Sequence, residues 1–225
     1  MLSRNTSEGR IGSESHVAFI YQTDEEHRKM LAWFLRQGLE RGERVIYIHD
    51  ALPVHSILAY LETDVPGAGA RLSSGELSFL DANDTYISEG IFDPWRVTAL
   101  LQRETKRALM DGYSALRVTG EMTWALRGAP GSERLIEYES GLNEIEVHGR
   151  CLTLCQYDRR RFPPSILLYV LASHPAVYVG TEVFENIYYK MVPSCGRQGT
   201  ATAALRNCLK NITACEIHSA LQVNH

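Results

Sequence analysis

The chain has 225 residues, 44% of them hydrophobic, and a formal net charge of −4. This length and composition suit one large α/β domain with a buried core and exclude an intrinsically disordered chain. The weak negative charge gives no general attraction to nucleic acid, and the longest apolar run, Ile166 to Ala172, is far too short to cross a membrane.

The amino terminus and the cysteines indicate a reducing compartment. Residues 1–15 are polar and lack the apolar segment of a secretory signal. The five cysteines are odd in number and lack the dense spacing of a disulfide framework. We therefore expect free thiols and a cytoplasmic location.

Strands and helices alternate along the first half of the chain. The hydrophobic pattern predicts, in order, a strand over 16–21, an amphipathic helix over 24–41 with Asp24 as its N-cap, a strand over 44–49, a short helix over 53–61 and a short strand over 77–80.

The alternation continues in the second half. We expect a helix from Asp93-Pro94 to Asp111, a strand over 115–118, a helix over 133–147 capped by Ser132, a strand over 150–157, a helix over 163–173 and a last strand over 174–179. Pro175 lacks the N–H that a central strand needs, which favours the sheet edge for this last strand.

The composition changes after Tyr189, where Gly, Thr, Ala, Asn and Cys become frequent. We predict a flexible amino terminus over 1–14, one main domain over 15–189 and a carboxyl-terminal tail over 190–225. The tail is expected to be loosely attached, with one short helix near 200–210.

Repeated strand–helix–strand units predict an α/β fold with three layers, in which helices cover both faces of a mostly parallel central sheet. Ligands of such sheets bind outside the carboxyl ends of the strands. These ends fall at Tyr21, at His49-Asp50, at Gly120-Glu121 and at Tyr157-Asp158. We therefore expect the site at this edge.

The first strand–helix junction lacks a phosphate loop. A P-loop protein carries glycines and a lysine there, which surround and neutralise phosphates. Here the junction is Gln22-Thr-Asp-Glu-Glu26, with no glycine, no lysine and several carboxylates. Anionic side chains repel phosphate. The sequence therefore has the order of strands and helices of a nucleotide enzyme, without the residues that bind phosphate.

Glu121 is the strongest candidate for chemistry, because it follows Gly120 at the end of a predicted buried strand. In an ATPase such a carboxylate serves magnesium or activates water. It could contact a ligand here, or it could pair with Arg117 or cap the next turn.

Three aromatic residues lie near the same predicted edge. Trp124 could wall an apolar pocket and donate its indole N–H, or it could pack in the core. Tyr21 and Tyr157 end neighbouring strands, where each either faces the crevice or belongs to the core or rim.

Signatures of a metal site or a nucleophile are absent from the local sequence. No H-E-x-x-H occurs, and Cys151 and Cys155 lack a second pair at finger-like spacing, so buried core thiols are the expectation. No G-x-S-x-G surrounds any serine. We expect no catalytic residue, no metal and no cofactor, and we interpret Arg159-Arg160-Arg161 as a solvated turn or an anion contact.

Several segments together resemble the MEDS family, the methanogen/methylotroph, DcmR-type sensory domain. They include Gly120-Glu-Met-x-Trp124, Glu137-Tyr-Glu139, Cys155-Gln-Tyr-Asp158, Gly75-Glu-Leu77, Glu43 to Ile48 and the strand from His16 to Tyr21. The resemblance covers about 15–189. It implies a sensory module with a KaiC/RecA-like fold, without the phosphate loop, that binds small organic molecules such as hydrocarbon derivatives.

On this basis we expect a non-catalytic regulatory domain that binds a small organic ligand and signals to a transcription or kinase partner. The expected ligand contacts are His16, Tyr21, Arg117, Glu121, Trp124 and Tyr157. No helix-turn-helix or kinase domain is recognisable, so we expect a separate regulatory partner or a fragment without its output domain. Self-association is compatible with this expectation, whereas direct contact with nucleic acid or a membrane is not.

Two other functions stay open. A degenerate RecA-like protein–protein interaction module would retain only the surfaces of the fold. A residual nucleotide-binding hydrolase would use Glu121, although the missing phosphate loop argues against it.

Overall fold

The computed structural model of the chain describes residues 16–65, 67–145, 149–179, 182–190 and 201–212. The strands are β1 (His16–Tyr21), β2 (Arg44–His49), β3 (Leu77–Asp81), β4 (Leu116–Glu121), β5 (Cys151–Asp158), β6 (Ala176–Val179) and β7 (Glu182–Glu185). They form one seven-stranded sheet in the order β3-β2-β4-β5-β1-β6-β7. All neighbours are parallel except β6 and β7.

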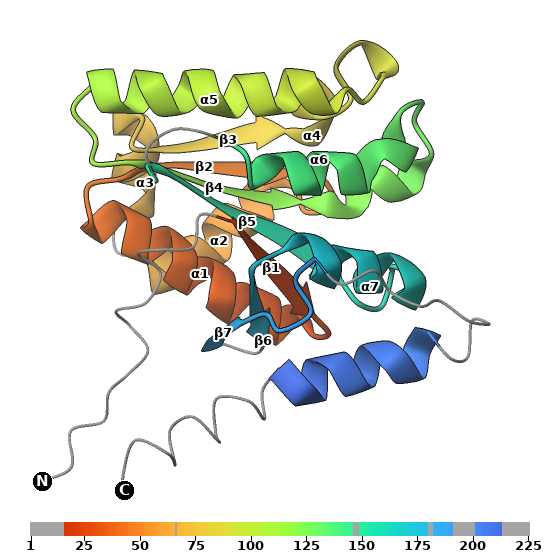
Figure 1. Cartoon of the computed structure of the whole chain (residues 1–225). Helices are drawn as coiled ribbons and strands as arrows, with labels where there is room; N and C mark the ends of the chain where they lie inside the picture. The colour runs from red at the N-terminus through yellow and green to blue at the C-terminus, as the bar shows by residue number, and fades with distance from the viewer. Residues whose placement is uncertain (1–15, 66, 146–148, 180–181, 191–200, 213–225) are drawn as a thin grey trace, which may run out of the picture.

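Helices cover both faces of this sheet (Figure 1). They are α1 (Asp24–Glu40), α2 (Val54–Asp64), α3 (Ala68–Ser74), α4 (Ala82–Thr85), α5 (Pro94–Met110), α6 (Leu135–Leu142) and α7 (Pro164–Ser173). One core lies between the sheet and α1, α2 and α3, and a second lies between the sheet and α5, α6 and α7. The predicted three-layer, mostly parallel α/β fold is confirmed.

Local capping explains where the two longest helices begin. Thr23 is the N-cap of α1, because its hydroxyl accepts a hydrogen bond from the Glu26 N–H while the Glu26 carboxylate accepts one from the Thr23 N–H. The prediction of Asp24 as this cap is therefore wrong by one residue. Asp93 caps α5 and Pro94 follows at its first turn, as predicted.

The sixth helix is shorter than the predicted span of 133–147. A 3₁₀ turn over Ser132–Arg134 precedes α6, and Ser132 makes no capping hydrogen bond to it. The Asn143 amide binds three backbone carbonyls, those of Glu139, Ser140 and Ser173. This side chain competes with the helical pattern and ends α6 at Leu142.

The last predicted strand is shorter than expected and does not form the sheet edge. β6 begins at Ala176, after Pro175, and pairs antiparallel with β7 on its outer side. Because β6 starts after the proline, the missing N–H removes nothing from the ladder.

The carboxyl-terminal segment contains a helix over 201–212. Ala201, Leu205, Leu209 and Ile212 recur at helical spacing, are buried and join the core beside α7. The prediction of a short helix is confirmed, and the expectation of a loose attachment is wrong for these residues.

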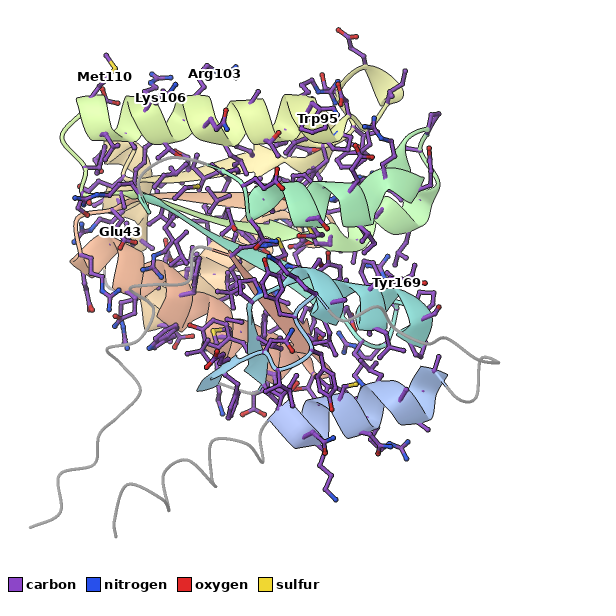
Figure 2. All side chains as sticks on the ribbon, in the orientation of Figure 1. Glu43, Trp95, Arg103, Lys106, Met110 and Tyr169 are labelled. Carbon is purple, nitrogen blue, oxygen red and sulfur yellow. The ribbon has the colours of Figure 1, made fainter. Side chains whose placement is uncertain are left out.

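The outer side of α5 is exposed, and its Arg103, Lys106 and Met110 side chains point away from the sheet (Figure 2). None of the helices in the described part of the chain is both long enough and apolar enough to cross a bilayer.

The packing of helix 201–212 is testable by truncating one buried side chain. We expect Leu205→Ala to lower the free energy of unfolding by about 2–5 kcal/mol, because it leaves a cavity in the core. The neighbouring Asn207 is exposed, so Asn207→Ala is the control and should have little effect. Urea unfolding measures both, and an equal, small effect would show that the helix is not docked.

Candidate functional site

The backbone N–H groups just before α1 are hydrogen-bonded to a carboxylate from the first turn of the same helix. Glu26 accepts hydrogen bonds from the backbone N–H of Gln22 at 2.8 Å and of Thr23 at 3.2 Å. A P-loop protein binds phosphate with the amides at this position. The anionic Glu26 therefore occupies the place of a phosphate, in agreement with the missing phosphate loop.

Tyr21 lies beneath an ion-pair network at the same edge. Arg160 binds Asp158 at 2.8 Å and Asp24 at 2.6 Å, and its guanidinium lies 6.0 Å from the centre of the Tyr21 ring. Burial and the charge of Asp158 raise the pKa of Tyr21, so its phenol stays protonated. Within the basic run Arg159-Arg160-Arg161, Arg160 is thus already paired with carboxylates of the same domain.

Glu121 holds the loop that follows β2. Its carboxylate accepts hydrogen bonds from the Tyr47 hydroxyl at 2.5 Å and from the backbone N–H of Asp50, Ala51 and Leu52 at 3.1, 2.5 and 3.3 Å. Glu121 therefore neither pairs with Arg117, whose partner is Glu43, nor caps the turn that follows it, and both of these alternatives are wrong; it caps the loop after β2 instead. Contact between Glu121 and a ligand stays a prediction.

Arg117 and Trp124 lie on opposite faces of the sheet. Arg117 is fully buried under α1, forms an ion pair with Glu43 at 2.5 Å and lies over the Phe34 ring. Figure 2 labels Glu43 just beyond the end of α1. Trp124 is fully buried on the other face and stacks on Tyr86, with a centroid distance of 4.9 Å. The six predicted residues therefore do not line one common crevice.

His16 and Tyr157 are brought together around a buried carboxylate, that of Glu139. His16 Nε2 lies 3.0 Å from Glu139 Oε2, and the Tyr157 hydroxyl donates to Oε1. His174 Nε2 lies 3.2 Å from the same Oε2, and Cys155 Sγ lies 3.5 Å from His16 Nε2. We call these five residues the Glu139 cluster.

Four parts of the fold position the Glu139 cluster. His16 begins β1, Cys155 and Tyr157 share one face of β5, Glu139 lies in α6, and His174 follows α7. All five side chains are buried, and four of them have no exposed surface. Figure 1 shows α6 and α7 beside each other over this part of the sheet.

Second hydrogen bonds fix the orientation of both imidazoles. Asn143 directs its NH₂ group to carbonyl oxygens, so its Oδ1, 3.1 Å from His16 Nδ1, accepts a hydrogen bond from that nitrogen. His174 Nδ1 donates to the Val170 carbonyl at 2.7 Å. Both Nε2 atoms therefore face Glu139, and His174 Nε2 has no hydrogen-bond partner.

The electrostatics of the Glu139 cluster are strongly perturbed. Burial and the neighbouring His174 lower the pKa of His16 to about 4. Burial would raise the pKa of Glu139, but His174 and His16 outweigh burial and hold it below its ordinary value. Burial and Glu139 raise the pKa of Cys155 well above its ordinary value. Perturbed groups of this kind mark candidate functional sites.

Four members of the Glu139 cluster could hold a metal ion, since donor atoms of His16, Glu139, Cys155 and His174 all lie within 4.8 Å of one another. Glu139 and His174 were not among the predicted contacts. Both residues lie more than 120 residues from His16 in the sequence, and Glu139 lies on a helix. No local sequence spacing therefore connects them with His16. The available signal for Glu139 was the Glu137-Tyr-Glu139 segment of the family resemblance, and no signal in the sequence indicated His174.

His27 forms a separate polar chain on the α1 face of the sheet. Its Nε2 lies 2.6 Å from Gln156 Oε1, and Gln156 in turn donates to the Thr119 hydroxyl at 2.7 Å. Burial lowers the pKa of His27, and the bond to Gln156 with the charges of Glu121, Asp24 and Asp158 offsets only part of this effect.

Comparisons with known proteins place the chain among sensory domains. The sequence signature of the MEthanogen/methylotroph, DcmR Sensory domain matches residues 15–175. The transcriptional repressor DcmR of Methylorubrum extorquens is 27% identical over 172 residues, which cover 75% of this chain and 61% of the repressor. The chain thus spans less than two thirds of that relative.

Two solved archaeal structures are similar to the chain, and the first of them shares its fold. The uncharacterised protein PH0321 of Pyrococcus horikoshii, solved with an unknown peptide, is 14% identical and aligns with a TM-score of 0.56 over 80% of this chain and 86% of its own. The flagellar accessory protein FlaH of Methanocaldococcus jannaschii is 14% identical and aligns with a TM-score of 0.49 over 82% of this chain and 83% of its own.

The lowered pKa of His27 makes stability depend on pH. In the unfolded chain His27 binds a proton near pH 6.5, whereas in the folded chain it does so only at lower pH. The contribution of neutral His27 to the free energy of unfolding is therefore fully present above pH 6.5 and is lost as the pH falls below it. We expect His27→Gln to reduce this slope by up to about 1.4 kcal/mol per pH unit. Urea unfolding of both proteins at several pH values measures it, and identical slopes would contradict the assignment.

Proposed function

The chain belongs to the methanogen/methylotroph, DcmR sensory domain family, and from this membership we propose that it senses a small organic molecule at the Glu139 cluster and signals to a regulatory partner. The sensing requires no catalysis and no nucleotide. A regulatory role agrees with the relative that acts as a transcriptional repressor.

The observation that carries this proposal is the complete burial of Glu139 among ionisable side chains. Removing charged groups from water costs several kcal/mol per ion, and well-packed apolar residues are often at least as stable. Stability alone therefore does not explain the Glu139 cluster. A polar group that binds a ligand or switches between two states does explain it.

A buried site also supplies a mechanism for signalling. The Glu139 cluster is closed, so a ligand can enter only if the surrounding elements open, and it then favours the open state. Differential affinity for two such states typically gives about 1–3 kcal/mol of coupling. Ligand binding would thereby change the packing of α6 and α7.

A chain of contacts links the Glu139 cluster to the carboxyl-terminal helix. The Asn186 amide donates to the His174 carbonyl at 2.8 Å and to the Leu171 carbonyl at 2.5 Å. Asn186 Oδ1 accepts from the Tyr188 N–H at 3.0 Å, and the Tyr188 hydroxyl accepts from Asn211 at 2.9 Å. The helix over 201–212 is therefore the proposed route to a partner.

A protein–protein interaction module is the second candidate. It is favoured by the carboxyl edge of the sheet, where Glu26, Arg160 and Glu121 bind groups of the chain itself. An edge filled in this way leaves the outer surfaces for contact with other proteins.

The sensing proposal predicts a ligand response that depends on one phenol hydroxyl. In a thermal-shift screen of small organic molecules, we expect a stabilising compound to raise Tm by about 5–10 °C at one hundred times its Kd. Tyr157→Phe should weaken this response because it removes a hydroxyl from the Glu139 cluster.

Two variants serve as controls for that screen. Tyr178→Phe removes another buried hydroxyl, one without a hydrogen-bond partner, and should leave the response intact. Glu121→Gln should also leave it intact. A response lost in Glu121→Gln and kept in Tyr157→Phe would move the site to the edge of the sheet, and the absence of any response would favour the interaction module.

Because Glu26 occupies the backbone N–H groups at the start of α1, we predict that nucleotides do not bind there. We expect isothermal titration of the chain with ATP and magnesium to show no saturable heat, because the Glu26 carboxylate holds the amides that phosphate would need. Magnesium-dependent binding in the micromolar range would support the residual hydrolase instead.

A further inference from the structure

Four donor atoms of the Glu139 cluster converge on one point inside the domain. We propose that His16 Nε2, His174 Nε2, Glu139 Oε2 and Cys155 Sγ bind a divalent transition-metal ion, with zinc the preferred ion. This inference deepens the proposed function, since the metal lies in the proposed sensing site. Nitrogen, oxygen and sulfur donors in a set of four are those of tetrahedral zinc sites in proteins.

The distances between the donor atoms suit such a site. Metal–ligand bonds of about 2.0–2.3 Å place the corners of a tetrahedron about 3.3–3.8 Å apart. Glu139 Oε2 lies 3.0 Å from His16 Nε2 and 3.2 Å from His174 Nε2, and Cys155 Sγ lies 3.5 Å from His16 Nε2. With every pair within 4.8 Å, small side-chain movements complete the tetrahedron.

The hydrogen bonds of the histidines leave the correct atoms free for a metal. Both Nδ1 atoms donate to oxygens outside the cluster, those of Asn143 and the Val170 carbonyl. In the neutral imidazole, Nε2 then carries a lone pair, and both lone pairs face a carboxylate oxygen. A proton or a metal cation at this point relieves the repulsion between these lone pairs and the Glu139 carboxylate, whose Oε2 lies 3.0 Å from His16 Nε2 and 3.2 Å from His174 Nε2.

Outer contacts resemble those that orient metal ligands. A metal-bound histidine usually donates its other N–H to a carbonyl or carboxylate, as His16 and His174 do here. A metal-bound carboxylate is itself hydrogen-bonded, and Tyr157 donates to Glu139 Oε1, which leaves Oε2 to the ion. Each donor is therefore held in place by a second group.

Charge balance favours a divalent ion. When a metal binds, Glu139 and Cys155 contribute two negative charges and the two neutral histidines contribute none. A divalent cation makes the total zero, which relieves the cost of burying an isolated carboxylate. A small ligand with an oxygen, nitrogen or sulfur atom could then replace one protein donor, which connects the metal to sensing.

The test measures metal content in the absence of any organic ligand. The purified full chain, loaded with zinc and desalted, is analysed by inductively coupled plasma mass spectrometry. We expect about one zinc per chain. Cys155→Ser and His174→Gln should lower the affinity for zinc at least 10-fold, and Asn143→Ala should lower it by about 10–100-fold through its effect on His16.

Matched controls separate ligation from burial. Cys151→Ser changes a buried cysteine of the same strand that lies outside the four-donor set, and His27→Gln changes a buried histidine on the other face of the sheet. Both should keep one zinc per chain. Cobalt titration of the unaltered chain gives a readout that needs no variant, because a Cys155 thiolate produces a sulfur-to-cobalt charge-transfer band.

The proposal is overturned if the unaltered chain binds neither zinc nor cobalt, or if Cys155→Ser and His174→Gln retain folded structure and full zinc content. Failure of the sensing proposal is a different result. In that case zinc binds with the expected stoichiometry, and the thermal-shift screen finds no organic ligand. If an organic ligand stabilises a chain that contains no bound metal, the metal proposal is contradicted and the sensing proposal is supported.

Discussion

The carboxylate of Glu139 has no exposed surface, and its neutralisation inside the domain constrains much of the surrounding fold. His16 meets it from the start of β1, Tyr157 from β5 and His174 from the end of α7. Asn143, which orients His16, is also the residue that ends α6. The start of β1 and the ends of α6 and α7 therefore all lie beside one buried carboxylate.

The polar groups of the two sheet faces serve different purposes. On the α1 face and at the carboxyl edge, carboxylates such as Glu26 and Glu121 cap backbone amides, so their charge is used within the fold. On the α6 and α7 face, four ionisable side chains of the Glu139 cluster bring their donor atoms within 4.8 Å of one another. For this reason we propose the function inside the domain, away from the edge where ligands of parallel α/β sheets bind.

The sequence allowed prediction of features with local signals. The alternation of strands and helices, the missing phosphate loop and the Asp93-Pro94 helix start all depend on neighbouring residues. The Asn143 side chain that shortens α6 and the pairing of β7 depend on tertiary contacts, so their effects were missed. For the site, His16 and Tyr157 were identified, whereas Glu139 and His174 meet them only through the fold.

The central claim is that Glu139 and its two histidines surround a bound cation. A crystal of the purified protein, measured on both sides of the zinc absorption edge, tests it most directly. We expect an anomalous peak about 2 Å from His16 Nε2, His174 Nε2 and Glu139 Oε2. Direct hydrogen bonds from both imidazoles to Glu139, with no density between them, would contradict it.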